Sequence, residues 1–128
     1  MRLLLDTHSF VWFIEGSQRL SSRARELIEA DAAEVYVSAA TGWEIATKHR
    51  LGKLPNVEAL VMDFEGAVLR AGMTGLAITL RHAAMAGSLT GDHRDPFDRI
   101  LSAQSLCDNL IFISNDEILD RFGISRIW

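Results

Sequence analysis

The sequence predicts an α/β fold in which helices cover both faces of a central, mainly parallel sheet. Short apolar runs alternate with segments of helical periodicity along the 128 residues, and that alternation is typical of parallel sheets. Runs such as 3–5 and 110–113 are continuously apolar, as expected of strands that are buried on both faces. No repeat, linker or low-complexity tract interrupts the chain, so we expect a single domain at 1–128.

The expected elements alternate along the whole chain. Strands are expected at residues 2–5, 34–38, 76–78, 110–114 and 124–127. Helices are expected around residues 10–14, from Ser21 or Ser22 to Ile28, at 39–51, from Pro55 to Leu69, from Thr79 to Gly87, at 96–108 and at 116–122. Spacing alone does not set the order of the strands. The helices between the second and third strands are expected to lie on one side of the sheet.

Capping residues and apolar spacing support these helices. The second helix follows a serine cap and carries an i, i+3, i+4 apolar stripe within 24–28. Gly52 ends the third helix as a left-handed cap. The fourth carries apolar residues along one side from 57 to 69. Thr79 caps the fifth, and Pro96 stands at the first helical position of the sixth.

Composition is that of an ordinary globular domain, with 48% hydrophobic and 23% charged residues. No apolar run approaches the roughly 18 residues that cross a bilayer, and Asp6 interrupts an N-terminus that begins like a signal peptide. The single Cys107 fits a reducing compartment, so we expect a cytoplasmic protein without a membrane segment. The net charge of −4 argues mildly against nonspecific nucleic-acid binding, unless cations neutralise part of it.

Four acidic residues occur where a parallel sheet would bring them together. Asp6 directly follows the first strand, and Asp116 follows the apolar run ending at Ile113 by three residues. Glu44 lies six residues after the second strand, and Asp98 lies in the first turn of the helix that begins at Pro96. Ligands of open α/β sheets bind at the carboxyl ends of the strands. Because gathered carboxylates repel one another unless cations neutralise them, we expect a Mg²⁺ or Mn²⁺ site.

Most of these acids also have structural explanations. Glu44 fits a capping box with Thr41 and forms an i, i+4 ion pair with Lys48. Asp95 is suited to cap the helix that contains Asp98, and Asp116 to a turn or cap.

Asp6 is less easily explained as a structural residue. Thr7 can cap the following helix, which would leave the Asp6 carboxylate free for a ligand. The four histidines share no spacing typical of zinc ligands. His93 is close to Asp95 and Asp98 in the sequence and could meet substrate, but the favoured interpretation is a solvated loop residue.

Several motifs together resemble a known family across essentially the whole chain. They are Leu4-Leu5-Asp6-Thr7-His8, Val37-Ser38-Ala39, Trp43-Glu44-Ile45-Ala46 with Lys48, Leu51-Gly52-Lys53-Leu54, His93-Arg94-Asp95-Pro96-Phe97-Asp98-Arg99 and Ser114-Asn115-Asp116. This set resembles PIN-domain ribonucleases, in particular the VapC-type toxins of bacterial toxin–antitoxin pairs. One departure is Gly42, which stands where a larger residue is usual.

The resemblance implies a three-layer α/β/α fold and a specific site. The family's acidic quartet, which binds metal and carries out catalysis, corresponds to Asp6, Glu44, Asp98 and Asp116. Thr7, Ser38 and Asp95 correspond to auxiliary polar residues around the metal. Among the basic residues Arg19, Lys48, Arg50, Lys53, Arg94 and Arg99, we expect Lys48, Arg94 and Arg99 to contact substrate.

The resemblance also implies an activity and partners. It predicts a Mg²⁺-dependent endoribonuclease that acts as a toxin, with RNA as substrate, a small cognate antitoxin protein as partner, and a homodimeric assembly. Two alternatives stay open at this point. One is a catalytically inactive PIN-like binding module, and the other is a phosphoacceptor signalling domain built on a similar sheet.

Overall fold

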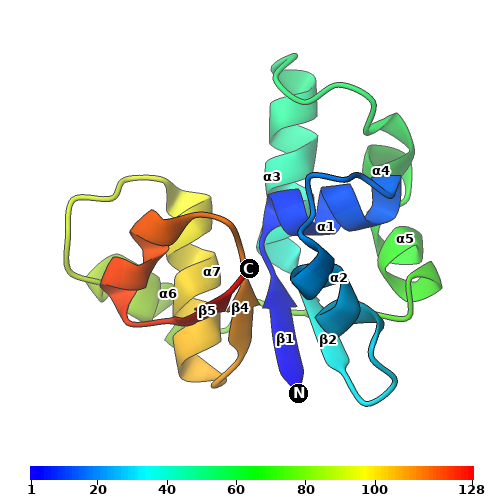
Figure 1. Cartoon of the computed structure of the whole chain (residues 1–128). Coiled ribbons are helices and arrows are strands. Elements are labelled where there is room, and N and C mark those ends of the chain that lie inside the picture. The colour runs from blue at the N-terminus through cyan, green and yellow to red at the C-terminus, as the bar shows by residue number, and fades with distance from the viewer.

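The computed structural model describes all 128 residues. Strands and helices alternate along most of the chain (Figure 1). The strands are β1 (Arg2–Leu5), β2 (Glu34–Ser38), β3 (Thr74–Leu76), β4 (Ile111–Ile113) and β5 (Ser125–Ile127). The helices are α1 (Thr7–Glu15), α2 (Ser22–Glu29), α3 (Ala39–Arg50), α4 (Glu58–Met62), α5 (Phe64–Arg70), α6 (Leu80–Ser88), α7 (Pro96–Cys107) and the 3₁₀ helix η1 (Glu117–Phe122). None of the helices is both long enough and apolar enough to span a bilayer.

All five strands join one parallel sheet in the order β3-β2-β1-β4-β5. The chain runs outward from β1 through β2 to β3, then crosses back to β4 on the other side of β1. The carboxyl ends of β1 and β4 therefore form the topological switch point, where α/β sheets open a crevice for ligands. Leu5 is in register with both Val37 and Ile113, so the three strands end within one residue of the same level.

Alternation along the central strands divides the core into two parts. Leu3 and Leu5 pack with residues of α1, α2, α4 and α5, whereas Leu4 packs with Leu101 of α7 and Phe112. Figure 1 shows the corresponding layers, with α1, α2, α4 and α5 on one side of the sheet and α6, α7 and η1 on the other. Strands that contact helices on both faces must be apolar at every position, which explains the unbroken Leu3–Leu5 run.

Three expected elements differ from the observed ones. The helix expected from Pro55 to Leu69 is two helices, because the chain leaves helical geometry at Asp63 (φ −149°, ψ 67°), whose side chain caps α5. The strand expected at 76–78 lies at Thr74–Leu76. Leu76 pairs with Ser38, the last residue of β2, so the residues after it have no strand to pair with. The segment at 116–122 forms a 3₁₀ helix rather than an α-helix.

Gly42 lies in α3 where the helix approaches Phe64. A Cβ atom at this position would lie 2.7 Å from Phe64 Cδ2, which is closer than real Cβ contacts allow. The ring of Phe64 is itself held edge-on against Phe10, at 5.7 Å between centroids. The glycine is therefore required by packing, even though glycine within a helix costs about 1 kcal/mol relative to alanine.

We predict that Gly42→Ala fails to stabilise the protein, because the clash with Phe64 outweighs the gain in helix propensity. Overpacking of this kind costs about 1–3 kcal/mol, so the free energy of unfolding in urea should fall. The matched control is Gly87→Ala in α6, where an added Cβ has nothing within 4 Å. This variant should gain about 0.5–1 kcal/mol. Equal stabilisation by both substitutions would contradict the packing argument.

Candidate functional site

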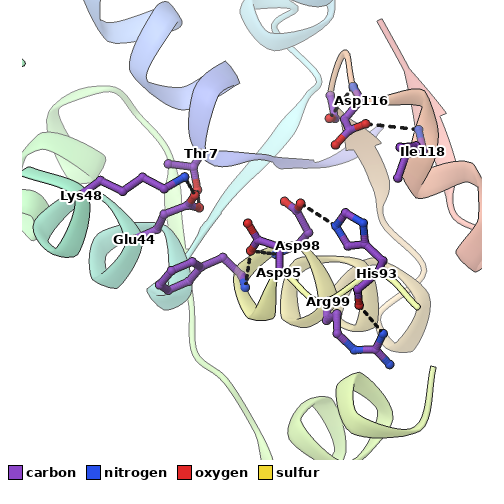
Figure 2. Close-up of polar contacts among 11 residues, drawn as sticks. Thr7, Glu44, Lys48, His93, Asp95, Asp98, Arg99, Asp116 and Ile118 are labelled. Carbon is purple, nitrogen blue, oxygen red and sulfur yellow. Dashed lines mark hydrogen bonds and ion pairs between the residues drawn. The ribbon is translucent and has the colours of Figure 1, made fainter. Parts of the chain in front are cut away.

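A polar pocket opens at the carboxyl ends of the central strands. It has a volume of about 330 Å³, and none of its lining residues is hydrophobic. The nine lining residues are Asp6, Thr7, His8, Glu44, Lys48, Asp95, Asp98, Asn115 and Asp116. All four acids predicted from the sequence thus lie around one space, together with Asp95. Figure 2 shows Glu44, Asp98 and Asp116 approaching it from α3, α7 and the segment after β4.

Asp6 lies at the centre of the switch point and is buried, with 8% of its surface exposed. Its Oδ1 accepts a hydrogen bond from the Ser9 backbone N–H at 2.8 Å, so Asp6 itself caps α1. The interpretation of Thr7 as the cap was wrong, because Asp6 is the last extended residue and its side chain reaches the first turn. Burial raises the pKa of Asp6, although hydrogen bonds with Ser114 and Ser9 lower it in part.

Glu44 is buried and has a partner on each oxygen. Thr7 Oγ1 donates to Glu44 Oε1, and the Lys48 ammonium bonds to Oε2, which confirms the i, i+4 pair. The capping-box interpretation of Glu44 was wrong, because α3 begins earlier, with Ser38 as its cap. Burial lowers the pKa of Lys48, but the hydrogen bond and charge of Glu44 outweigh that effect, so the pKa is raised and Lys48 stays protonated.

Asp98 lies in the first turn of α7 with Asp95 as the helix cap, as expected. Asp95 Oδ1 accepts hydrogen bonds from the backbone N–H groups of Phe97 and Asp98 at 2.9 and 3.1 Å. Asp98 Oδ2 lies 2.9 Å from His93 Nε2 (Figure 2). Burial raises the pKa of Asp98 to about 6, and the nearby charges of Asp95 and Glu44 add to the rise, while the His93 hydrogen bond opposes it.

His93 was expected to be a solvated loop residue, and that expectation was wrong. Its ring is partly buried, because it packs edge-on against Phe122, with 6.0 Å between ring centroids. Its contact with Asp98 agrees with the proximity of His93 to Asp95 and Asp98 in the sequence. His8 and Asn115 were missed as lining residues, although each lies within two residues of a predicted acid.

The predicted basic and auxiliary residues occupy different environments. Arg99 uses its three guanidinium nitrogens on the carbonyls of Ala86, Leu89 and His93, so it secures the loop before α7. Ser38 is fully buried as the α3 cap, outside the pocket lining. Arg94 is exposed beside His93.

Asp116 is partly exposed at the carboxyl end of β4. It caps η1 through a hydrogen bond from the Ile118 N–H to Oδ1 at 3.2 Å. Its own N–H donates to Ser114 Oγ at 3.1 Å, which fixes the turn after the strand. The cap interpretation is therefore confirmed, and the same geometry directs the residue toward the pocket. Asp98 Oδ1 and Asp116 Oδ2 have no protein donor, so these oxygens are available to a ligand.

The pocket has the donor chemistry of a hard-metal site without a ready-made coordination cluster. No three His, Cys, Asp or Glu side chains are arranged closely enough to hold an ion as they stand. Asp6, Glu44, Asp98 and Asp116 each contact a polar group of the protein through one carboxylate oxygen or more. Carboxylate oxygens are the ligands that Mg²⁺ and Mn²⁺ prefer. Burial raises the pKa values of Asp6 and Asp98, and for Asp98 the charges of Asp95 and Glu44 add to the rise.

Fold and sequence together identify the class. The family model described as PIN domain matches residues 3–124, so the chain belongs to the PIN domain family. No curated protein sequence matches the chain significantly.

Solved structures with the same fold include chains of toxin–antitoxin complexes. One is VapBC2 from Rickettsia felis bound to a DNA fragment from its promoter, with a TM-score of 0.73 and 15% identity over 99% of this chain and 98% of that chain. VapBC-1 from nontypeable Haemophilus influenzae gives a TM-score of 0.69 at 16% identity, covering 99% and 97%. FitAcB from Neisseria gonorrhoeae gives a TM-score of 0.65 at 18% identity, over 98% of this chain and 96% of that chain. At such low identity the likeness concerns the fold.

We predict that Asp98→Asn stabilises the metal-free protein at neutral pH. Because the folded-state pKa is raised, the protonated carboxyl favours folding below the ordinary value of 3.8, and that contribution is lost as the pH rises through about 6. The ionised carboxylate therefore costs stability at pH 8. Each pKa unit is equivalent to about 1.4 kcal/mol. We expect the free energy of unfolding of the variant to exceed that of wild type by about 1–2 kcal/mol, after allowing for the partial exposure of Asp98 and for the helix dipole.

The measurement is urea unfolding in EDTA at pH 8 and near pH 4. The gain should shrink at the lower pH, where Asp98 of the wild-type protein is already protonated in the folded state. A variant that is less stable than wild type by the same amount at both pH values would show that Asp98 contributes mainly through its hydrogen bonds.

Proposed function

We propose that this protein is a Mg²⁺- or Mn²⁺-dependent endoribonuclease that acts as the toxin of a VapBC-type toxin–antitoxin pair. The observation that carries the proposal is the gathering of Asp6, Glu44, Asp98 and Asp116 in one pocket at the switch point of a PIN-family fold. Asp6 and Glu44 are buried beside the half-buried Asp98 and Asp116, and gathering these acids is costly for folding. Metal-assisted phosphodiester hydrolysis would give the group a chemical use.

Each acid has a distinct position relative to an ion. Asp98 and Asp116 each keep one oxygen without a protein donor, and Asp6 lies between the ends of β1 and β4, so these three would hold the metal. Such an ion supplies positive charge to the phosphate and lowers the pKa of a water molecule. Glu44 has both oxygens occupied by Thr7 and Lys48, which favours a role in orienting groups around the ion.

RNA is the proposed substrate, with Lys48 and Arg94 as the nearest basic contacts. Lys48 lines the pocket and stays protonated, so it can face a phosphate once the ion neutralises the acids. Arg94 is exposed in the loop that carries His93. Arg99 is fully engaged with backbone carbonyls, and we therefore give it the indirect role of holding that loop. Asp95 and Thr7 act as auxiliary residues through Asp98 and Glu44.

The remaining parts of the proposal concern partners and location. The VapBC and FitAcB structures are complexes, and by analogy we propose a small antitoxin protein as partner. The homodimeric assembly and the cytoplasmic location are proposed from the family resemblance of the sequence alone. A basic antitoxin side chain would find the same charge in the pocket that attracts a metal ion.

A catalytically inactive PIN-like binding module is the second candidate. It is favoured by the engagement of Glu44 with Lys48 and by the lack of a preassembled cluster. The phosphoacceptor alternative is disfavoured by topology, because such domains use the strand order 2-1-3-4-5, whereas this sheet has β3-β2-β1-β4-β5. Titration with Mn²⁺ separates the two remaining candidates, since an inactive module has no need of Asp6-dependent metal binding.

We predict that Asp6→Asn abolishes Mg²⁺-dependent cleavage of cellular RNA while the fold persists. Asparagine can still cap α1, and it removes a buried charge, so thermal stability should be equal or higher. The measurement is gel analysis of total RNA with and without EDTA. Asp63→Asn is the matched control, because Asp63 also caps a helix but lies outside the pocket. Unchanged cleavage by a pure Asp6→Asn sample would remove the assignment.

We also predict that metal binding weakens as the pH falls through about 6. An ion requires the ionised form of Asp98, whose pKa is about 6, so affinity should drop about tenfold between pH 7 and pH 5. Mn²⁺ binding followed by electron paramagnetic resonance measures this directly. Asp98→Asn should bind weakly and lose most of the pH dependence. A wild-type affinity that is flat across this range would count against Asp98 as a ligand.

A further inference from the structure

A second pocket opens next to the acidic one and shares one side chain with it. It has a volume of about 590 Å³ and lies between one face of α1, the turn that follows this helix, and the segment after α3. Its ten lining residues are His8, Val11, Trp12, Glu15, Ser17, Arg19, Lys53, Leu54, Pro55 and Asn56. His8 also lines the acidic pocket, so a chain that leaves that pocket past His8 enters this one.

The charge of the second pocket is opposite in character to that of the first. Arg19 and Lys53 are both exposed, and their side chains make no ion pair or hydrogen bond within the protein. Glu15 is the only acid in the lining. By contrast, Lys48 and Arg99 are held by protein groups. The second pocket thus offers two uncommitted cations beside a site that is dominated by carboxylates.

Aromatic rings form part of the same lining. His8 and Trp12 lie one helical turn apart on α1, with 5.5 Å between ring centroids and a 41° tilt. Trp12 is partly buried and is supported from another direction by Trp128, at 6.0 Å between centroids. The exposed ring of His8 and the supported ring of Trp12 therefore present fixed aromatic surface next to the two cations.

We propose that this second pocket binds the nucleotides that flank the scissile phosphodiester of a single-stranded RNA. The inference rests on the proposed nuclease function and adds the path of the substrate. Cationic grooves with aromatic platforms are the usual means of holding single strands, because phosphates contact the cations and bases stack on the rings. The volume lies within the range of small-molecule sites, about 300–1,000 Å³, and can accept a nucleotide. Arg19 and Lys53 contact phosphate, and Trp12 with His8 contacts a base.

The test is equilibrium binding of a fluorescent single-stranded oligouridylate, about 12 nucleotides long, with 2′-O-methyl sugars in Mg²⁺ buffer. Anisotropy gives the affinity, and gel electrophoresis verifies that the probe is intact. The test variant is Arg19→Ala combined with Lys53→Ala. The control is Arg23→Ala combined with Arg81→Ala, which removes the same charge from exposed positions on α2 and α6.

The expected result is that the affinity of the test variant for the probe falls about tenfold or more. The slope of log affinity against log salt concentration should also become shallower by about 1.4, since each of the two single-strand phosphate contacts contributes about 0.7. The control should stay within about twofold. A 4-thiouridine probe should also crosslink to the tryptic peptide of residues 3–19, which contains His8 and Trp12. Circular dichroism establishes that both variants are folded.

Each other outcome overturns a defined part of the argument. If wild type and test variant bind the probe equally, the path through this pocket is wrong and the nuclease proposal stands. If oligoglutamate binds more tightly than the RNA and depends on Arg19 and Lys53, the pocket serves an acidic protein segment instead. If wild-type protein neither binds the probe nor cleaves RNA, the proposed function fails and the substrate path fails with it.

Discussion

The structure depends on the parallel register that aligns β1 with β2 and β4. Leu5 is paired with Val37 on one side and Ile113 on the other, and the Asp6 N–H donates to the Ile113 carbonyl at 3.1 Å. That alignment ends the three strands within one residue of the same level and directs the following segments to the same edge. Acids that are far apart in the chain meet there because of this register.

The acids then impose an electrostatic cost that the surroundings only partly offset. Lys48 and Thr7 form hydrogen bonds with the Glu44 carboxylate, and His93 contacts Asp98. Backbone N–H groups at the starts of helices donate to Asp6, Asp95 and Asp116. The pKa of Asp98 still rises to about 6, and that of Asp6 is also raised. Folding thus keeps a site that would be more stable with additional positive charge, a pattern common where function competes with stability.

The two neighbouring pockets make complementary demands on one ligand. The first attracts cations, and the second offers unpaired Arg19 and Lys53 with aromatic surface. A metal ion alone would occupy only the acidic pocket. A basic protein segment would also prefer the acidic pocket, because its charge is opposite to that of the carboxylates. A single-stranded polyanion that arrives with divalent metal can use both, which is why the nucleic-acid interpretation accounts for more of the surface than either alternative. The overall net charge of −4 conceals this local separation.

The sequence by itself determined the α/β class, the positions of most elements and the four acids that gather in the pocket. Apolar runs and caps are local signals, and the family motifs surround Asp6, Glu44, Asp98 and Asp116. The strand order, the short β3, the break at Asp63 and the reason for Gly42 were decided by tertiary contacts. So were the hydrogen bond from Thr7 to Glu44 and the ring contact between His93 and Phe122, because these contacts are set by which elements pack together. Local spacing carries no information about which residue from a distant element will lie within hydrogen-bonding distance.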